Sequence, residues 1–93
     1  MPLLSPTHVA EKLKSIPGWE LSGQEIVRQF TFDDFEQAMA FVNRVARKAE
    51  AAGHHPDIDI RYNKVRLGLV SHDAGGLTER DIELAAACNA LLG

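Results

Sequence analysis

Apolar residues recur at two different periods along the chain, and the period separates helices from strands. From Ser5-Pro6 to Pro17-Gly18 they are three or four residues apart, which predicts a helix with a capping hydroxyl at its start. The next stretch, 19–32, alternates apolar and polar side chains around a turn at 22–24. This alternation predicts two strands joined as a hairpin.

A second and longer helical period follows the hairpin. Asp33 is expected to cap this helix with Glu36 as its capping-box partner, and Gly53 is expected to end it in a left-handed conformation. The predicted apolar stripe consists of Phe35, Ala38, Met39, Val42, Val45, Ala46 and Ala49.

Residues 57–62 return to strict alternation, with Ile58, Ile60 and Tyr62 on the side expected to be buried. A tight turn at 63–64 would lead into a returning strand that ends near residue 72. This turn pairs residues 57 and 70 and therefore predicts that His72 lies opposite His55.

The last segment is a third helix. Thr78 is expected to cap it, and Asp81 stands at the capping-box position. The predicted order is thus α-β-β-α-β-β-α, which indicates an α+β fold with one antiparallel four-stranded sheet and three helices packed on one face. Residues 1–93 are expected to form a single domain. Because so small a domain buries only about two-thirds of its unfolded surface, oligomerisation through the open sheet face or an edge strand is a natural expectation.

Composition excludes several classes of protein. The 93 residues carry a net charge of −3 and are 45% hydrophobic, with no basic stripe, so neither disorder nor direct nucleic-acid binding is expected. No apolar run approaches the roughly 20 residues of a membrane span, and no signal peptide is evident. Cys88 is the only cysteine and is expected to be a buried, inert thiol. These features predict a cytoplasmic protein in a reducing compartment.

Histidine is the one pattern that points to chemistry. Three of the four histidines lie within residues 54–72, and imidazole changes its charge near neutral pH. The alternative is structural: His54 could place a cation at the end of a helix, His72 could be a loop residue, and Asp81 could serve only as a cap. A metal site is not expected, because adjacent histidines before a proline are not an i, i+4 pair and no cysteine assists them.

The same residues carry a resemblance to a known family. Glu50-x3-His54-His55-Pro56 is followed by Tyr62, His72 and Asp81, with GGLTERD before the last helix and Trp19 after the first. In this spacing the chain resembles the pterin-4a-carbinolamine dehydratases, also described as the dimerisation cofactors of a homeodomain transcription factor. The resemblance covers nearly the whole chain.

The resemblance implies an enzyme that removes water from 4a-hydroxytetrahydropterin to give quinonoid dihydropterin, a step that recycles the cofactor of aromatic amino-acid hydroxylases. No cofactor or metal is implied, and the family is usually a homotetramer. The implied catalytic residues are His54, His55 and His72, with Glu50 and Asp81 behind them orienting the imidazoles. The implied substrate contacts also include Pro56, Ser71, Asp73 and Ala74.

Two positions depart from the family pattern, and two other functions stay open. Ile58 stands where many members have an aromatic residue, and Ser71 replaces a frequent threonine while keeping its hydroxyl. The chain could instead be a non-catalytic binding module for a transcription factor or a pterin-dependent hydroxylase. It could also act on another pterin, such as a molybdopterin or folate intermediate.

Overall fold

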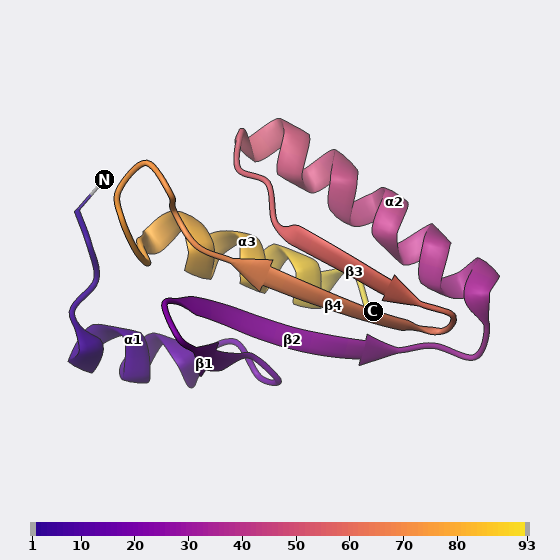
Figure 1. Cartoon of the computed structure of the whole chain (residues 1–93), viewed down its shortest axis with the longest axis horizontal. Helices are drawn as coiled ribbons and strands as arrows, with labels where there is room; N and C mark the ends of the chain where they lie inside the picture. Colours follow the sequence, from indigo (N-terminus) through magenta and orange to yellow (C-terminus); the bar gives the residue numbers. More distant parts are fainter. Residues whose placement is uncertain (1, 93) are drawn as a thin grey trace.

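The computed structural model describes residues 2–92 and has the predicted α+β order (Figure 1). Its elements are α1 (Pro6–Leu13), β1 (Glu20–Ser22), β2 (Glu25–Thr31), α2 (Phe35–Ala52), β3 (Asp57–Arg61), β4 (Lys64–Leu69) and α3 (Glu79–Ala90). The first helix ends before Pro17-Gly18, because residues 14–18 form turns. None of these helices is both long enough and apolar enough to cross a membrane.

The four strands form one antiparallel sheet in the order β1-β2-β4-β3. The second hairpin therefore lies beside β2 through its returning strand, and β3 is an edge strand. One face of the sheet is covered by helices, and the other carries polar side chains such as Gln29 and Arg66, which are paired across β2 and β4.

The core lies between the sheet and the helices. Ile26 and Phe30 from β2 face Leu69 and Val65 from β4, and all four are almost fully buried. The buried residues of α2 that complete this layer are Ala38, Phe41, Val42, Val45 and Ala49. Phe41 belongs to this stripe in place of Phe35, which is half exposed at the start of the helix.

The residues that cap the helices are the predicted ones, except at the start of α2. Gly53 ends α2 with φ +64°, as predicted, and Thr78 and Asp81 form the predicted capping box of α3. The cap of α2 is Asp34 and not Asp33: Asp34 has the extended backbone that a cap requires, and its Oδ1 accepts the Gln37 N–H at 2.8 Å.

The predicted register of the second hairpin was wrong by two residues. Arg61 pairs with Lys64, so the turn consists of Tyr62 and Asn63, and Asp57 pairs with Gly68. Asn63 fixes the turn to the start of α2, since its Nδ2 donates to the Phe32 carbonyl at 2.8 Å. As a result β4 ends at Leu69, and His72 lies in a turn beyond the strand.

The alternation in β3 was predicted correctly, but burial of its apolar side was not. Ile58 and Ile60 face Leu67 and Val65, yet they are 40% and 36% exposed, while Tyr62 is 65% exposed. Because β3 is an edge strand, the helices cover its apolar side only in part.

Candidate active site

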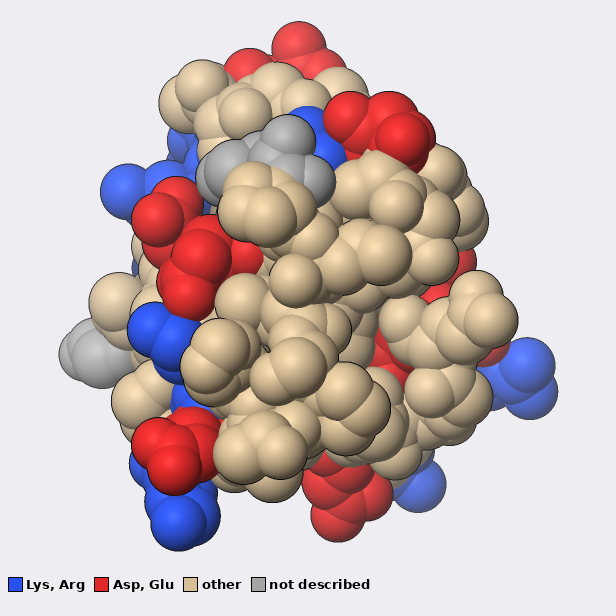
Figure 2. All heavy atoms as spheres, turned by 90° about the vertical axis from the view of Figure 1, so that its left-hand side faces the viewer, with Lys and Arg blue, Asp and Glu red and all other residues tan. Residues whose placement is uncertain are grey.

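The predicted site residues gather at one end of the molecule, where three elements meet. The end of α2 and the start of β3 provide residues 50–56, the segment after β4 provides 71–76, and the start of α3 provides 78–81. This end lies on the left of Figure 1. Seen face on, its centre is mostly uncharged and its acidic and basic side chains lie around the margin (Figure 2).

The end of α2 determines where His54 points. The Gly53 N–H donates to the Glu50 carbonyl, and the His54 N–H donates to the Ala49 carbonyl at 3.1 Å. These two bonds close the helix as a Schellman motif, which needs the left-handed glycine. The backbone N–H of His54 thus completes the cap, and its imidazole is left to turn inward, where it is 8% exposed.

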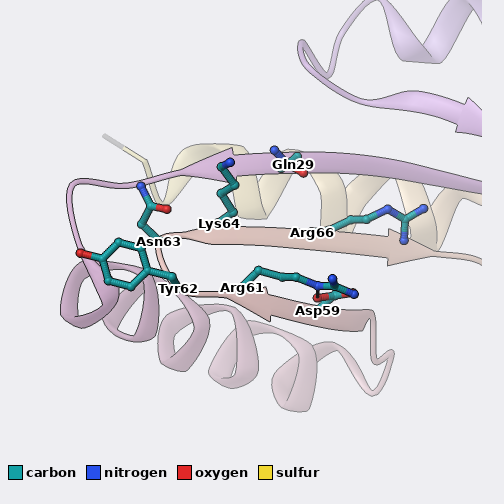
Figure 3. A pocket seen from close by; sticks show the side chains of 7 residues that line it. All are labelled: Gln29, Asp59, Arg61, Tyr62, Asn63, Lys64 and Arg66. Atoms are coloured by element: carbon teal, nitrogen blue, oxygen red, sulfur yellow. Dashed lines mark hydrogen bonds and ion pairs between the residues drawn. The ribbon is translucent and has the colours of Figure 1, made fainter.

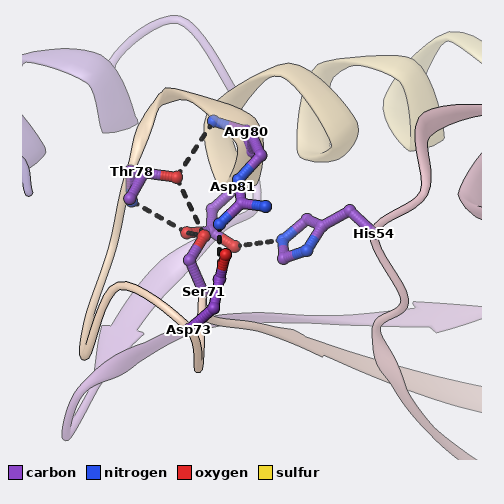
Figure 4. A network of polar contacts seen from close by, with 6 residues as sticks. All are labelled: His54, Ser71, Asp73, Thr78, Arg80 and Asp81. Atoms are coloured by element: carbon purple, nitrogen blue, oxygen red, sulfur yellow. Dashed lines mark hydrogen bonds and ion pairs between the residues drawn. The ribbon is translucent and has the colours of Figure 1, made fainter. Parts of the chain in front are cut away.

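Asp81 receives that imidazole (Figure 4). Its Oδ1 lies 2.6 Å from His54 Nε2, and its Oδ2 accepts the Ser71 Oγ–H and the Thr78 N–H, both at 2.9 Å. Asp81, Ser71 and Thr78 are completely buried. A buried carboxylate is tolerated where its oxygens are hydrogen-bonded, as these are.

With Asp81 as a carboxylate, one set of donors satisfies this network. Ser71 has a single hydroxyl hydrogen and gives it to Asp81, so Thr78 Oγ1–H donates to Ser71 Oγ across 2.8 Å. An ionised carboxylate can only accept, so Nε2 of His54 carries a hydrogen. In the neutral imidazole, Nδ1 is then the basic nitrogen, and it makes no hydrogen bond to any residue in 2–92.

His55 has a different environment although it is the next residue. Its Nε2 lies 2.6 Å from Glu50 Oε1, one turn back on α2, and both side chains are largely exposed. Pro56, which follows, is half-buried. Glu50 and Asp81 therefore each contact one imidazole.

His72 lies in a short loop, 71–76, whose two ends are joined by backbone hydrogen bonds. The Ser71 carbonyl accepts N–H bonds from Ala74, Gly75 and Gly76, and Ser71 N–H donates to the Gly76 carbonyl. His72 and Asp73 are exposed at the tip of this loop. No hydrogen bond in residues 2–92 joins His72 to either of the other two motif histidines.

Two hollows are lined by motif histidines, one by His54 and the other by His72, and they share no lining residue. One, of about 400 Å³, is lined by His54 and Arg80 together with residues of α2 and α3. The other, of about 360 Å³, is lined by His72, Gly75 and Gly76 together with the turn before β2. A larger hollow, of about 680 Å³, lies on the open face of the sheet among side chains of β2, β3 and β4, and none of the three histidines lines it (Figure 3).

Sequence reasoning missed two members of this site. Thr78 contributes its hydroxyl to the Asp81 network as well as capping α3. Arg80 donates from its guanidinium to Asp73 Oδ1 at 2.6 Å and also lines the His54 hollow. Both belong to GGLTERD, but only the three-dimensional contact shows what they hold. Across the described range 2–92, no group of three His, Cys, Asp or Glu side chains is arranged to bind a metal ion.

The chain is thus a small α+β domain with two contacts between an imidazole and a carboxylate at one end of its sheet. Residues 2–91 match the family model of pterin 4 alpha carbinolamine dehydratase, and the chain belongs to this family. A protein of Acidobacterium capsulatum, named provisionally as a pterin-4-alpha-carbinolamine dehydratase, is 64% identical over 99% of this chain and all of its own length. A relative from Chloroflexus aurantiacus with the same provisional name is 59% identical over the full length of both chains.

Solved structures show the same relationship. A protein of Brucella melitensis described as a transcriptional coactivator/pterin dehydratase has a TM-score of 0.93 and 36% identity, covering 98% of this chain and 99% of that one. A pterin dehydratase-like protein described as a RuBisCO assembly factor of the alpha-carboxysome has a TM-score of 0.66 and 26% identity, covering 81% and 87%.

Proposed function

We propose that this protein dehydrates 4a-hydroxytetrahydropterin to quinonoid dihydropterin, with its residues 1–93 acting as one catalytic domain. The observation that carries the proposal is the buried contact between His54 Nε2 and Asp81 Oδ1 at 2.6 Å. A carboxylate behind an imidazole fixes its tautomer and stabilises its protonated form, which is the arrangement that acid–base catalysis uses. The family match supplies the class of substrate.

The reaction needs one proton delivered and one removed. Expulsion of the C4a hydroxyl requires a general acid that converts it to water, while a general base takes the proton from N5 as the C=N bond forms. We assign His54 as the principal acid/base and His72 as its partner. One imidazole ends the step with a proton more and the other with a proton less, and exchange with solvent restores both.

The remaining motif residues position the ring and the imidazoles. His55 orients the pterin, supported by Glu50, and Asp81 holds His54. Pro56, Ser71, Asp73 and Ala74 would border the bound pterin. The hollows lined by His54 and by His72, of about 400 and 360 Å³, are each within the range of small-molecule sites, and a pterin that contacts both imidazoles would have to bridge them.

The deciding experiment follows the ultraviolet change of enzymatically generated 4a-hydroxytetrahydropterin with wild type, His54→Ala and His72→Ala. We expect acceleration by the wild type that both substitutions reduce at least about 100-fold, the lower end of the contribution of a general acid or base. A folded His54→Ala variant with full turnover would overturn the assignment of His54. A folded wild type without acceleration would overturn the dehydratase itself.

We further propose that the protein is a cytoplasmic homo-oligomer that serves a pterin-dependent hydroxylase in cofactor recycling. Exposed apolar side chains support the oligomer. Ile58 and Ile60 on the edge strand β3 are each more than a third exposed, and Phe35 on α2 is half exposed. Exposed apolar side chains on an edge strand favour pairing with another chain. Molar mass in solution, measured by light scattering, distinguishes a dimer or tetramer from a monomer.

A binding function without turnover is the second candidate. It is favoured by the descriptions of two structural neighbours, one a transcriptional coactivator and the other a RuBisCO assembly factor. It predicts that His54→Ala leaves partner binding intact. Replacement of the substrate by another pterin, such as a molybdopterin intermediate, tests the remaining alternative.

A further inference from the structure

Arg80 connects the two parts of the candidate site. Its guanidinium donates to Asp73 Oδ1 at 2.6 Å (Figure 4). Its side chain also lines the hollow that contains His54. Asp73 directly follows His72 in the loop after β4. The contact therefore runs from the first turn of α3, where Asp81 holds His54, to the loop that carries the other proposed acid/base.

Few hydrogen bonds hold the tip of the loop that carries His72. Three of its N–H groups bond to the Ser71 carbonyl, so the loop is held at its base. At its tip, the only side-chain bond to residues 2–92 is the one between Asp73 and Arg80. The hydrogen bond and charge of Arg80 also hold the pKa of Asp73 below its ordinary value, so the carboxylate is ionised at neutral pH.

This ion pair is poorly placed to stabilise the fold. Asp73 is 73% exposed and Arg80 is 27% exposed, and pairs at such sites contribute little to the free energy of unfolding. Arg80 Nε is buried without a hydrogen-bond partner in residues 2–92, which adds a cost. A contact that stabilises little but fixes the neighbour of a proposed catalytic group is better explained by positioning.

We propose that Arg80 is a positioning residue of the pterin site, which acts by clamping Asp73 so that His72 is held at a fixed place relative to His54. The proposal rests on the dehydratase function above. It predicts that Arg80 affects turnover through His72, because small displacements of a catalytic group lower the rate.

The variants are Arg80→Gln, Arg80→Lys and Asp73→Asn, with Lys12→Gln as a matched control. Lys12 also forms an ion pair with the first turn of α3, at 3.0 Å to Glu79, but within the described range 2–92 it makes no hydrogen bond or ion pair with loop residues 71–76. We expect Arg80→Gln and Asp73→Asn each to lower kcat about 10-fold, because each breaks the contact that holds the loop. Arg80→Lys keeps one donor for Asp73 and should stay within about threefold of wild type. Lys12→Gln should match wild type.

Dependence on His72 separates positioning from a general structural effect. In a His72→Ala background, Arg80→Gln should cause no further loss, because the group that it positions is gone. An equal loss of kcat in both backgrounds would overturn the proposal. Asp73 is exposed, so Asp73→Asn gives a folded variant even if Arg80→Gln does not fold.

A measurement that does not depend on turnover tests the Arg80–Asp73 contact separately from the proposed dehydratase activity. Amide exchange at Ala74, Gly75 and Gly76, followed by NMR, should be about 10-fold faster in Arg80→Gln than in wild type or Lys12→Gln. Unchanged exchange would overturn the clamp, whatever the activity. Faster exchange in a protein whose wild type shows no dehydration would keep the clamp and overturn its catalytic role.

Discussion

Asp81 offers the sharpest test of the site, because it has a structural and a chemical role that one substitution separates. Asp81→Asn keeps the size of the side chain. Its amide oxygen can still accept from Ser71 and Thr78, while its NH₂ group faces His54 Nε2. That nitrogen must then accept, and the hydrogen of the neutral imidazole moves to Nδ1. The helix cap survives, but the basic nitrogen of His54 is reversed.

The magnitudes follow from three hydrogen bonds. A bond to a charged group is worth about 1.5–3 kcal/mol and a neutral one about 1 kcal/mol, and the uncharged amide recovers part of the difference because it is easier to bury. We expect Asp81→Asn to lower the free energy of unfolding by about 1–3 kcal/mol. For a chain of this length that decreases Tm by roughly 5–20 °C. Asp81→Ala leaves all three donors unpaired and should cost about 3–5 kcal/mol.

Turnover should fall more steeply than stability. We expect Asp81→Asn to lower kcat about 100-fold, since Nδ1 can no longer accept a proton in the neutral ring. Urea unfolding followed by fluorescence of the buried Trp19 measures stability, and nitrogen shifts in NMR identify the His54 tautomer. Asp34→Asn, which alters only the cap of α2, should change stability by less than about 0.5 kcal/mol. Wild-type turnover and an unchanged tautomer in Asp81→Asn would show that Asp81 is a cap and nothing more.

Other predictions concern single positions. Gly53→Ala should lower the free energy of unfolding by about 1–2 kcal/mol in thermal melts, purely from the left-handed backbone, because an added Cβ there has no neighbour within 4 Å. Cys88 should resist alkylation until the protein unfolds, since burial raises the pKa of its thiol to about 11; rapid labelling of native protein would contradict this. Ile60→Lys should reduce the molar mass in light scattering if β3 forms the oligomer contact, and an unchanged mass would exclude that strand. Because the pKa of Asp73 is lowered, its ion pair with Arg80 is present above about pH 4 and is lost as pH falls through the lowered value, so loop amide exchange should rise only in that acidic range.

Features determined by local chemistry could be predicted from the sequence. Gly53 and the Thr78–Asp81 capping box were predicted correctly, because each depends on residues within one helical turn. Asp33 and Asp34 have the same chemistry, and only the observed backbone selects the second as the cap. The fold class followed from the order of the periods.

Features determined by tertiary contacts could not be predicted from the sequence. In the turn at Tyr62 and Asn63, Tyr62 has φ +53°, a backbone conformation that a tyrosine rarely adopts. This turn is fixed by contacts between Asn63 and Phe32, two residues that are 31 positions apart in the sequence. Alternation identified the apolar side of β3 but not its place at the edge of the sheet. The site residues were predicted by family spacing, whereas the bond between His54 and Asp81 spans 27 residues and appears only in the fold.

Because α2 ends at a left-handed glycine, the adjacent imidazoles of His54 and His55 lie in different environments. His54 turns into the protein and is 8% exposed, whereas His55, one residue later, lies in solvent beside Glu50. Reagents that acylate imidazole therefore modify the exposed His55 before the largely buried His54. In a time course of such labelling, His54 belongs to a slower phase than His55, and the ratio of the two rates measures how far the fold shields the inner imidazole.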